Sequence, residues 1–564
     1  MLTVLLCCCA CLQATGTRKA PPPVAPVAPS VKRPVPPPEL YFNLIVGEMR
    51  AAEKDWPGAL ESFTEALRYD NASSYLHLQI CHLYTYQGDF DKAVAWCKKA
   101  VACDPDSIEA HYMLGRIYAA LNKIDEAIVE YKILLQHNPD DHETCLSLAS
   151  LYADSGRYSQ AMNLIKKLIK ANPNSAMSHF HLANMYSDLK KYGAAVKSYK
   201  KTISINPYFK PAYLNLAALY EEKQEPSKAI ATYSKLLKYD PDDFRIIEKK
   251  AFLYIKMHQL DKALQQYDSI RIMHPPAASD MAVKIGLIYF EQRKWNLAIQ
   301  EFLRSLELNE KNSRARYYLG NAFEESGKIP EALNAFNAIE DNSSFYVDAS
   351  IHAAFLYNQN DELNQARQII HEALKKKSTD IKLYRFLASL YEKDENYIEA
   401  IAVLRNALNV EPDNEELLFY IGVLYDKASM LEECISSLQA LLKINSSHAD
   451  ALNFIGYTYA DKGIKLDQAE EFVKKALKLK PDDGYITDSL GWVYFKKGMY
   501  RKALQKLKRA NSLSPEDPVI SEHLGDAYLK NNRPKKALEM YRRAYELDSS
   551  KDELQEKINR LRQP

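Results

Sequence analysis

Three histidines and a cysteine, all residue types that can hold a transition metal, recur every 34 residues along the sequence: His77, His111, Cys145 and His179. If each lies on its own helix in a stack, neighbouring side chains are about 10 Å apart, the usual separation of packed helices. That distance is too large for one ion. We therefore predict that these histidines are ordinary core or surface residues and that there is no metal site.

Cys81 and Cys97 offer a second possible chemistry, because the spacing can place them on facing helices. A disulfide between them is conceivable in an oxidising compartment. Corresponding places elsewhere in the chain carry Ala or another small apolar residue, and a free cysteine behaves as a small hydrophobe. Packing is the interpretation we prefer, with the disulfide as the alternative.

Signatures of the main catalytic classes are missing from the sequence. We find no GxxxxGK[ST], GxSxG or HExxH motif, and no pair of CxxC motifs at zinc spacing. His371 and Glu372 continue as Ala-Leu-Lys, which does not make a metalloprotease helix. We predict that the chain is not an enzyme and has no cofactor.

The elements that position all these residues follow a period of 34, which holds from Leu40 to Lys551. We number each repeat so that a small residue stands at position 8. Position 11 is Tyr or Phe in every repeat except the first, where Arg50 stands. Single-residue insertions occur near 275–278 and at 463–466. Position 8 reads Gly47, Cys81, Gly115, Ala149, Ala183, Ala217, Ala251, Gly286, Gly320, Ala354, Ala388, Gly422, Gly456, Gly491 and Gly525. Position 20 reads Ala59, Ala93, Ala127, Ala161, Ala195, Ala229, Ala263, Ala298, Ala332, Ala366, Ala400, Cys434, Ala469, Ala503 and Ala537.

Small residues at positions 8 and 20 allow two antiparallel helices to approach closely, and we expect the aromatic residue at position 11 to fill the space between them. Pro at position 32 of nine repeats ends the second helix. The pattern resembles the tetratricopeptide-repeat (TPR) family. The resemblance implies an all-α solenoid, a right-handed superhelix of fifteen helix pairs, closed by a polar capping helix at 552–564. It also implies a protein or peptide partner, because such a fold works through the surface it presents.

Composition narrows the class of partner. The 564 residues carry 74 Lys and Arg against 73 Asp and Glu, a net charge of +1. A nucleic-acid-binding surface needs clustered cations, so we predict no nucleic-acid partner.

The segment before the array divides into an apolar run at 1–12 and a proline-rich spacer at 13–39. An apolar run, small residues, a cysteine and a spacer together resemble a bacterial lipoprotein signal, which implies acylation at Cys11. We accordingly expect an outer-membrane lipoprotein that faces the periplasm and touches the membrane only through its lipids. The alternative is a cytoplasmic protein with a disordered leader.

One candidate binding site lies in repeats five to seven. Family members that grip a C-terminal carboxylate use Lys and Asn, then Asn, then two cations at fixed groove positions. Here these places carry Phe180, Asn184, Asn215, Arg245 and Lys249. Four of the five chemical types match, and they could donate charge-assisted hydrogen bonds to a carboxylate. The alternative is that they are solvated surface residues.

The charge of the side chains expected to line the groove changes from negative to positive along the chain. First helices are expected to line the groove through positions 2, 5, 6, 9, 12 and 13. Such a groove could orient a partner, or it could simply be a solvated face. Positions 12 and 13 are acidic in the middle repeats (Asp154, Asp188, Glu221, Glu222, Glu291, Glu324, Glu325), whereas Lys393, Lys427, Lys496 and Lys530 stand at position 13 later.

A second candidate site lies near the C-terminus. The stretch 453–526 resembles bacterial envelope lipoproteins of the LbcA type, adaptors of periplasmic carboxy-terminal processing proteases. A tryptophan among acids could anchor a partner side chain. The alternative is that these residues lock the last three repeats together. The candidate residues are Asp488, Trp492, Glu522, His523 and Asp526.

The sequence thus predicts a scaffold or adaptor that recruits a protein such as a protease to the membrane. The alternative function is an assembly factor in a secretion, pilus or polysaccharide-export complex. The sequence gives no prediction of the oligomeric state.

Overall fold

A computed structural model describes residues 37–550 and 552–562 of the chain. Cys11, the apolar run at 1–12 and most of the spacer at 13–39 lie outside the described residues. The chain divides into two compact units, residues 1–241 and 242–564, and each is considered by itself.

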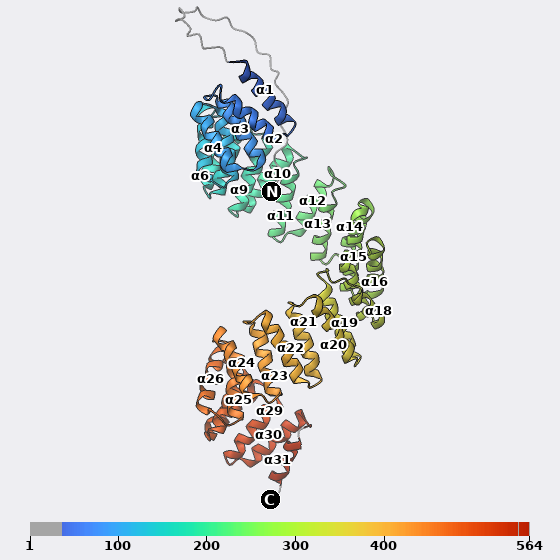
Figure 1. The fold of residues 1–564 in the computed structure, drawn as a ribbon. Helices are drawn as coiled ribbons and strands as arrows, with labels where there is room; N and C mark the ends of the chain where they lie inside the picture. The colour runs from blue at the N-terminus through green and yellow to red at the C-terminus, as the bar shows by residue number, and fades with distance from the viewer. Residues whose placement is uncertain (1–36, 551, 563–564) are drawn as a thin grey trace, which may run out of the picture. The chain divides into compact units, whose positions relative to one another are not determined.

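The first unit consists of helices that lie beside one another in chain order (Figure 1). Its helices are α1 Pro38–Ala52, α2 Trp56–Ala66, α3 Ser74–Gln87, α4 Phe90–Cys103, α5 Ile108–Ala120, α6 Ile124–His137, α7 His142–Asp154, α8 Tyr158–Ala171, α9 Ala176–Asp188, α10 Tyr192–Ile205, α11 Lys210–Glu222 and α12 Pro226–Leu236.

The second unit continues the same pattern. Its helices are α13 Phe244–Lys256, α14 Leu260–Met273, η1 Pro275–Ala277, α15 Ala278–Glu291, α16 Trp295–Leu308, α17 Ser313–Glu325, α18 Ile329–Asn337, α19 Tyr346–Gln359, α20 Leu363–Lys376, α21 Ile381–Lys393, α22 Tyr397–Val410, α23 Glu415–Lys427, α24 Leu431–Ile444, α25 Ala449–Asp461, α26 Leu466–Leu479, α27 Gly484–Lys496, α28 Tyr500–Leu513, α29 Pro518–Lys530, α30 Pro534–Leu547 and α31 Asp552–Arg562.

Within the described residues there is no strand, and the helices form fifteen pairs followed by α31, so the predicted all-α solenoid is confirmed. The first insertion forms the 3₁₀ turn η1. The second places Lys465 in the left-handed region, with φ of 46°, just before α26. Helix α1 begins two residues before the predicted array, because proline is well tolerated in the first turn of a helix.

The small residues at position 8 face the side chain at position 24 of the same repeat. A Cβ atom added at Gly320 would lie 2.5 Å from Phe336, and one added at Gly286 would lie 2.5 Å from Phe302. Both phenylalanines are at most 2% exposed. The space opposite position 8 is therefore filled from position 24. The aromatic at position 11 lies against the second helix of its own repeat, as where the Lys228 ammonium is 5.8 Å from the centre of the Tyr220 ring.

The aromatic residue at position 11 also borders the preceding repeat. The Lys98 ammonium lies 5.9 Å from the centre of the Tyr118 ring, and the Arg405 guanidinium lies 5.6 Å from that of Tyr425. In both pairs the cation belongs to the second helix of the preceding repeat. Such cation–π contacts help to hold successive repeats in register.

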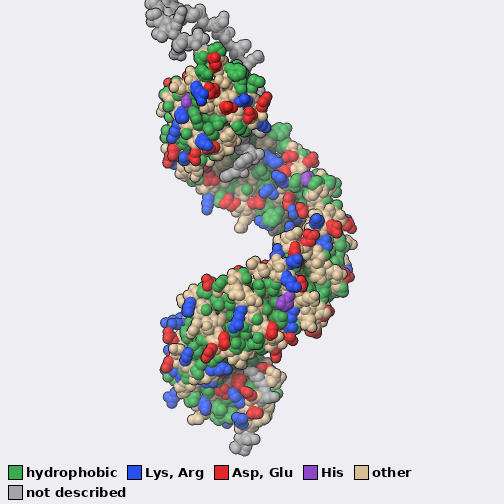
Figure 2. Space-filling view, viewed as in Figure 1, with side chains coloured by type: hydrophobic (Ala, Val, Ile, Leu, Met, Phe, Trp, Pro, Cys, Tyr) green, Lys and Arg blue, Asp and Glu red, His purple; other side chains and the backbone are tan. Residues whose placement is uncertain are grey.

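Charged side chains of both signs are interspersed over the visible face of each unit (Figure 2). None of the helices in the described ranges combines the length and apolar character that a membrane span requires.

Candidate functional site

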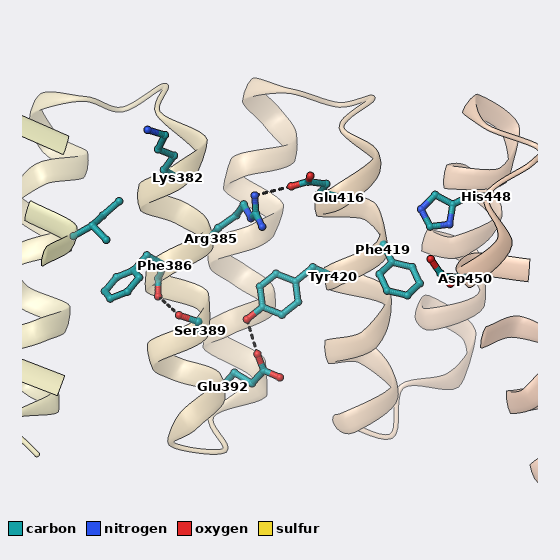
Figure 3. A pocket seen from close by; sticks show the side chains of 11 residues that line it. Lys382, Arg385, Phe386, Ser389, Glu392, Glu416, Phe419, Tyr420, His448 and Asp450 are labelled. Carbon is teal, nitrogen blue, oxygen red and sulfur yellow. Dashed lines mark hydrogen bonds and ion pairs between the residues drawn. The ribbon is translucent and has the colours of Figure 1, made fainter. Parts of the chain in front are cut away.

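A cleft of about 830 Å³ opens on the second unit, along the first helices of repeats ten to thirteen (Figure 3). We call it the aromatic cleft. Most of its lining residues stand at positions 2, 5, 6, 9 and 12, the positions expected to line the groove. Its lining residues are Ile351, Lys382, Arg385, Phe386, Ser389, Glu392, Glu416, Phe419, Tyr420, His448 and Asp450.

Aromatic rings form the apolar part of the cleft. Phe386, Phe419 and Tyr420 come from α21 and α23 and are each half-buried. The Phe419 ring stacks on the His448 ring, with centroids 5.5 Å apart, and meets the Phe454 ring edge-on at 6.2 Å. His448 is itself fixed, because its Nδ1 accepts a hydrogen bond from the backbone N–H of Ala451 at the start of α25. The rings are thus held in place while one side of each stays open.

Paired charges surround these rings. Arg385 donates to Glu416 at 2.6 Å, as drawn in Figure 3, and Lys382 donates to Asp348 at 3.0 Å. Asp450 accepts from Lys480 at 2.7 Å. These pairs are exposed, so each charge can exchange its partner for a group on a bound polypeptide at little cost.

Glu392 is the most constrained acid of the cleft. It accepts hydrogen bonds from Tyr420 at 2.5 Å and from Lys427 at 2.6 Å. Partial burial opposes its ionisation, but the hydrogen bonds from Lys427 and Tyr420 outweigh it, and the pKa of Glu392 lies below its usual value. Burial, and then the bond to Glu392, raises the pKa of Tyr420. Glu392 is therefore ionised and joins α21 to α23.

The first unit has a smaller pocket of about 380 Å³ on its own groove positions. We call it the acidic pocket, because Asp154, Asp188 and Glu222 line it, each at position 13 of its repeat. Partial burial and the neighbouring Asp154 raise the pKa of Asp188. Burial lowers the pKa of His181, against the opposing effect of Asp154. The charges of this pocket suit a cationic group better than an anion.

Two residues of the proposed carboxylate clamp lie in this acidic pocket. Asn184 Oδ1 accepts hydrogen bonds from Tyr199 at 2.7 Å and from Asn215 at 3.0 Å. Both asparagines therefore already bond to protein, and carboxylates stand beside them. Arg245 and Lys249 are exposed on α13 of the second unit. The carboxylate clamp stays a prediction.

The late lysines at position 13 reach back to the preceding repeat. Lys393 donates to Asn358 at 2.9 Å, Lys427 to Glu392 at 2.6 Å and Lys496 to the backbone carbonyl of Asp461 at 3.0 Å. Lys530 lies over the Tyr500 ring at 5.9 Å. The contacts of Lys393, Lys427 and Lys496 tie successive first helices together, whereas Lys530 reaches the second helix α28.

The C-terminal candidate residues form a buried cluster. Trp492 and His523 are 8% and 6% exposed, and their rings stack with centroids 3.9 Å apart. Asp488, 5% exposed, accepts a hydrogen bond from Nδ1 of His523 at 2.9 Å. Glu522 and Asp526 accept from Lys557 of α31 at 2.9 and 3.0 Å. These are the contacts that would lock the last repeats to the capping helix.

Models of the tetratricopeptide repeat match residues 50–181, 187–347, 383–418 and 425–555, which together make up most of the chain. The chain belongs to the tetratricopeptide-repeat family. TPR arrays generally act as protein-binding scaffolds.

Known TPR proteins give further comparisons. A TPR repeat-containing protein of Pseudomonas aeruginosa, PA4667, is 40% identical over 57 residues, which is 9% of this chain and 10% of that protein. A TPR protein from Parabacteroides merdae has a TM-score of 0.37 and 16% identity, over 44% of this chain and 98% of its own. The match to the structure of the Cut9–Hcn1 complex of APC/C has a TM-score of 0.34 and 14% identity, and it covers 93% of this chain and 96% of the other. The match to yeast Tom70 has a TM-score of 0.30 and 14% identity, and it covers 93% of this chain and 95% of Tom70.

The histidines and cysteines that could ligate a metal make separate contacts within the TPR array. His111 donates through Nε2 to the Pro105 carbonyl at 3.0 Å and bonds to Glu130 through Nδ1 at 2.6 Å. His179 bonds to the Pro173 carbonyl at 3.1 Å. No group of three or more His, Cys, Asp and Glu is placed to hold a metal among residues 37–550 and 552–562. Cys81 and Cys97 are buried free thiols, and the pKa of Cys97 is raised by its hydrogen bond to Cys81 and by burial.

The aromatic cleft was not predicted from the sequence. Its signal was readable, because Phe386, Phe419 and Tyr420 stand at groove positions 6, 5 and 6 of adjacent TPR repeats. An aromatic residue at such a position is open to a partner, unlike the one at position 11. Reading the repeats together for aromatic residues at groove positions would have found the cleft.

Proposed function

We propose that this TPR protein is a non-enzymatic adaptor whose aromatic cleft holds an extended segment of another polypeptide. The observation that carries the proposal is the set of half-buried rings of Phe386, Phe419 and Tyr420, held in place and open on the groove face. Rigid aromatic side chains lose little entropy on binding and bury a large apolar area, so they are the usual anchors of an interface.

The chemistry of the bound segment follows from the cleft. An apolar side chain would pack on the rings, while the charges of Arg385 and Glu416 bond to polar groups on either side. The hydroxyl of exposed Ser389 donates to the Phe386 carbonyl at 2.7 Å, so its oxygen would accept from a backbone N–H of the segment. No step of bond making or breaking is needed for this role.

We further propose that the adaptor is a lipid-anchored envelope protein that faces the periplasm and recruits a protease or another hydrolase. The support is the lipoprotein-like segment ending at Cys11, the spacer after it and the resemblance of residues 453–526 to the protease adaptors. Lipids would fix the protein to the membrane, and the spacer would give the TPR array reach.

The test compares a cleft variant with a matched control in a pull-down from detergent-solubilised membranes. Phe386→Ala with Phe419→Ala removes two anchors, whereas Ile398→Ala truncates a side chain that is 59% exposed on α22, outside the cleft. Truncating an anchor typically costs about 2 kcal/mol, so the double variant should retain its partner at least roughly tenfold less well than wild type. Far-ultraviolet circular dichroism confirms that both variants are folded.

Equal retention by the cleft variant and by wild type would contradict a role for the aromatic cleft. Mass spectrometry of the retained protein separates the two functional classes. A protease or hydrolase supports recruitment, whereas subunits of a secretion, pilus or export complex support the assembly factor.

A further inference from the structure

Helix α1 exposes a stripe of apolar side chains on the first unit. Phe42 is 67% exposed, Ile45 55% and Met49 59%, and all three lie on neighbouring turns. Such a stripe is unusual on the surface of a terminal repeat, where polar residues normally face solvent.

Two residues of the stripe, Phe42 and Met49, lie on the face that stacks repeats, and Ile45 stands beside them at groove position 6. In repeat two, positions 3, 7 and 10 are Leu76, Ile80 and Leu83, which pack in one cluster with residues of α2. In repeats two to fifteen, residues at position 3 are at most 2% exposed and those at position 10 at most 6%. Phe42 and Met49 occupy these two positions of repeat one, and no helix in the described part of the chain covers them.

The C-terminal end is closed by the chain itself. Leu554 and Ile558 of α31 are 0% and 2% exposed and belong to the cluster that contains Tyr541 of α30. Helix α31 therefore takes the place of a further first helix, as its position beside α30 shows (Figure 1). The second helix of the last repeat is thus not available to receive α1 of another molecule, and growth from head to tail is blocked.

We propose that the exposed stripe of α1 binds the same stripe of a second copy of this chain, with the two helices antiparallel about a two-fold axis. A two-fold interface must be self-complementary. We place the two-fold axis between Ile45 and Val46. In this register Phe42 of one copy lies opposite Met49 of the other, and Ile45 of one copy lies opposite Val46 of the other.

This register also suits the flanking residues. Glu48 of one copy lies opposite Asn43 of the other, so no like charges meet across the interface. Sulfur–aromatic contacts such as Phe42 with Met49 are favourable by about 0.3–1.5 kcal/mol. The interface is independent of the aromatic cleft, which lies in the other unit.

Charge exchange between opposed positions tests the proposal. Analytical ultracentrifugation of the full chain, at about 1 to 100 µM to cover weak association, should show a dimer. Phe42→Glu alone and Met49→Lys alone should each raise the dimer Kd at least about tenfold, because a charge is placed against an apolar side chain. An equimolar mixture of the two variants should associate again, since the introduced carboxylate of one copy then meets the introduced ammonium of the other, and the unchanged Phe42 meets the unchanged Met49. Ile272→Glu, at a site 76% exposed on α14, is the control and should leave the dimer unchanged.

A monomeric wild-type chain across that range would overturn the proposal, as would single variants that dimerise like wild type. A mixture that stays monomeric while wild type dimerises would overturn the antiparallel register. Photo-cross-linking from p-benzoylphenylalanine at position 42 identifies the occupant. Cross-links between two copies support the proposal, whereas cross-links within one chain to residues 1–36, or to lipid, overturn it.

Discussion

At the scale of single residues, close helix pairing depends on the match between positions 8 and 24. Each phenylalanine at position 24 faces a glycine: Phe63 with Gly47, Phe302 with Gly286 and Phe336 with Gly320. Repeat eleven carries the smaller Leu404 at position 24, and Ala388 stands at its position 8, both fully buried. In the three Gly–Phe pairs the ring occupies the space that a Cβ atom would need. The exchange is not general, because Tyr199, Tyr233 and Tyr267 stand at position 24 of repeats that carry Ala at position 8.

Gly320→Ala should destabilise the protein, because its Cβ would lie 2.5 Å from the ring of Phe336, which is 2% exposed and has little room to move. Overpacking of this kind costs about 1–3 kcal/mol. Adding Phe336→Leu should recover most of the loss. Urea unfolding followed by circular dichroism measures both effects.

Gly193→Ala is the matched control for this substitution. Its Cβ would meet no heavy atom within 4 Å, and the residue lies in α10. Because alanine favours the helix, this variant should be as stable as wild type or more stable by up to about 1 kcal/mol. If both glycine variants behaved alike, tight packing at position 8 would not be the reason for the small residue.

The residue pattern predicted the small positions and their purpose, but it did not predict the partner of position 8. Position 24 varies from Cys97 through Ile165 to Phe336 and Tyr541, so no single type marks it. Position 11 is aromatic in almost every repeat, and for this reason we expected it to fill the space between the paired helices. The ring at position 11 borders the second helices of its own and of the preceding repeat, whereas the space opposite position 8 is filled by residues of changing size.

At the scale of elements, successive first helices are joined by side chains at positions 12 and 13. Glu392 on α21 accepts from Lys427 on α23, and Lys393 on α21 reaches Asn358 on α19. The helices themselves were predicted from the repeat, and their short connecting turns follow. Several of these turns place a residue other than glycine in the left-handed region, such as Lys54 and Lys190, whose residue type gives no local signal.

Glu392→Gln should destabilise the second unit at neutral pH and have no effect in strong acid. The pKa of Glu392 is depressed in the folded state, so its stabilising effect is complete above the unfolded pKa of about 4.3 and is lost as the pH falls through the folded value. We expect a loss of about 0.5–1 kcal/mol at pH 7, since Lys427 is partly exposed.

Urea midpoints of the Gln variant and wild type at pH 7 and about pH 2.5 check this expectation. Glu416→Gln is the control, because Glu416 pairs with Arg385 at 2.6 Å but is 71% exposed. That variant should change stability less at neutral pH. A difference between wild type and Glu392→Gln that persists at the acidic pH would contradict the assigned role of the carboxylate.

At the scale of the whole molecule, the sequence predicted the class of fold, the number of repeats and the closing helix, since a period repeated fifteen times leaves little freedom. The binding surface was predicted less well. Tryptophan is a residue type that often anchors an interface, yet the ring of Trp492 is buried against His523. Burial of one groove residue depends on neighbours one and two repeats away, which a reading of single motifs does not include.

Cys11→Ser should release the full chain from membranes if this residue carries the proposed lipids. Two or more acyl chains are needed for stable anchoring, and the substitution removes the thiol that would receive them. Fractionation of cells into membrane and soluble pools, followed by immunoblotting, measures the shift. Cys9→Ser serves as the control, and equal membrane association of both variants would remove Cys11 from consideration.

The most direct test of the account is site-specific photo-cross-linking in the intact cell, with p-benzoylphenylalanine placed at Ser389 in the aromatic cleft or at Ile398 on α22. The account predicts that Ser389 gives a discrete adduct with another protein, that Phe419→Ala weakens this adduct, and that Ile398 gives none. Adducts of the same protein from both positions, or no adduct from Ser389, would contradict the claim that the groove face of this array holds a partner.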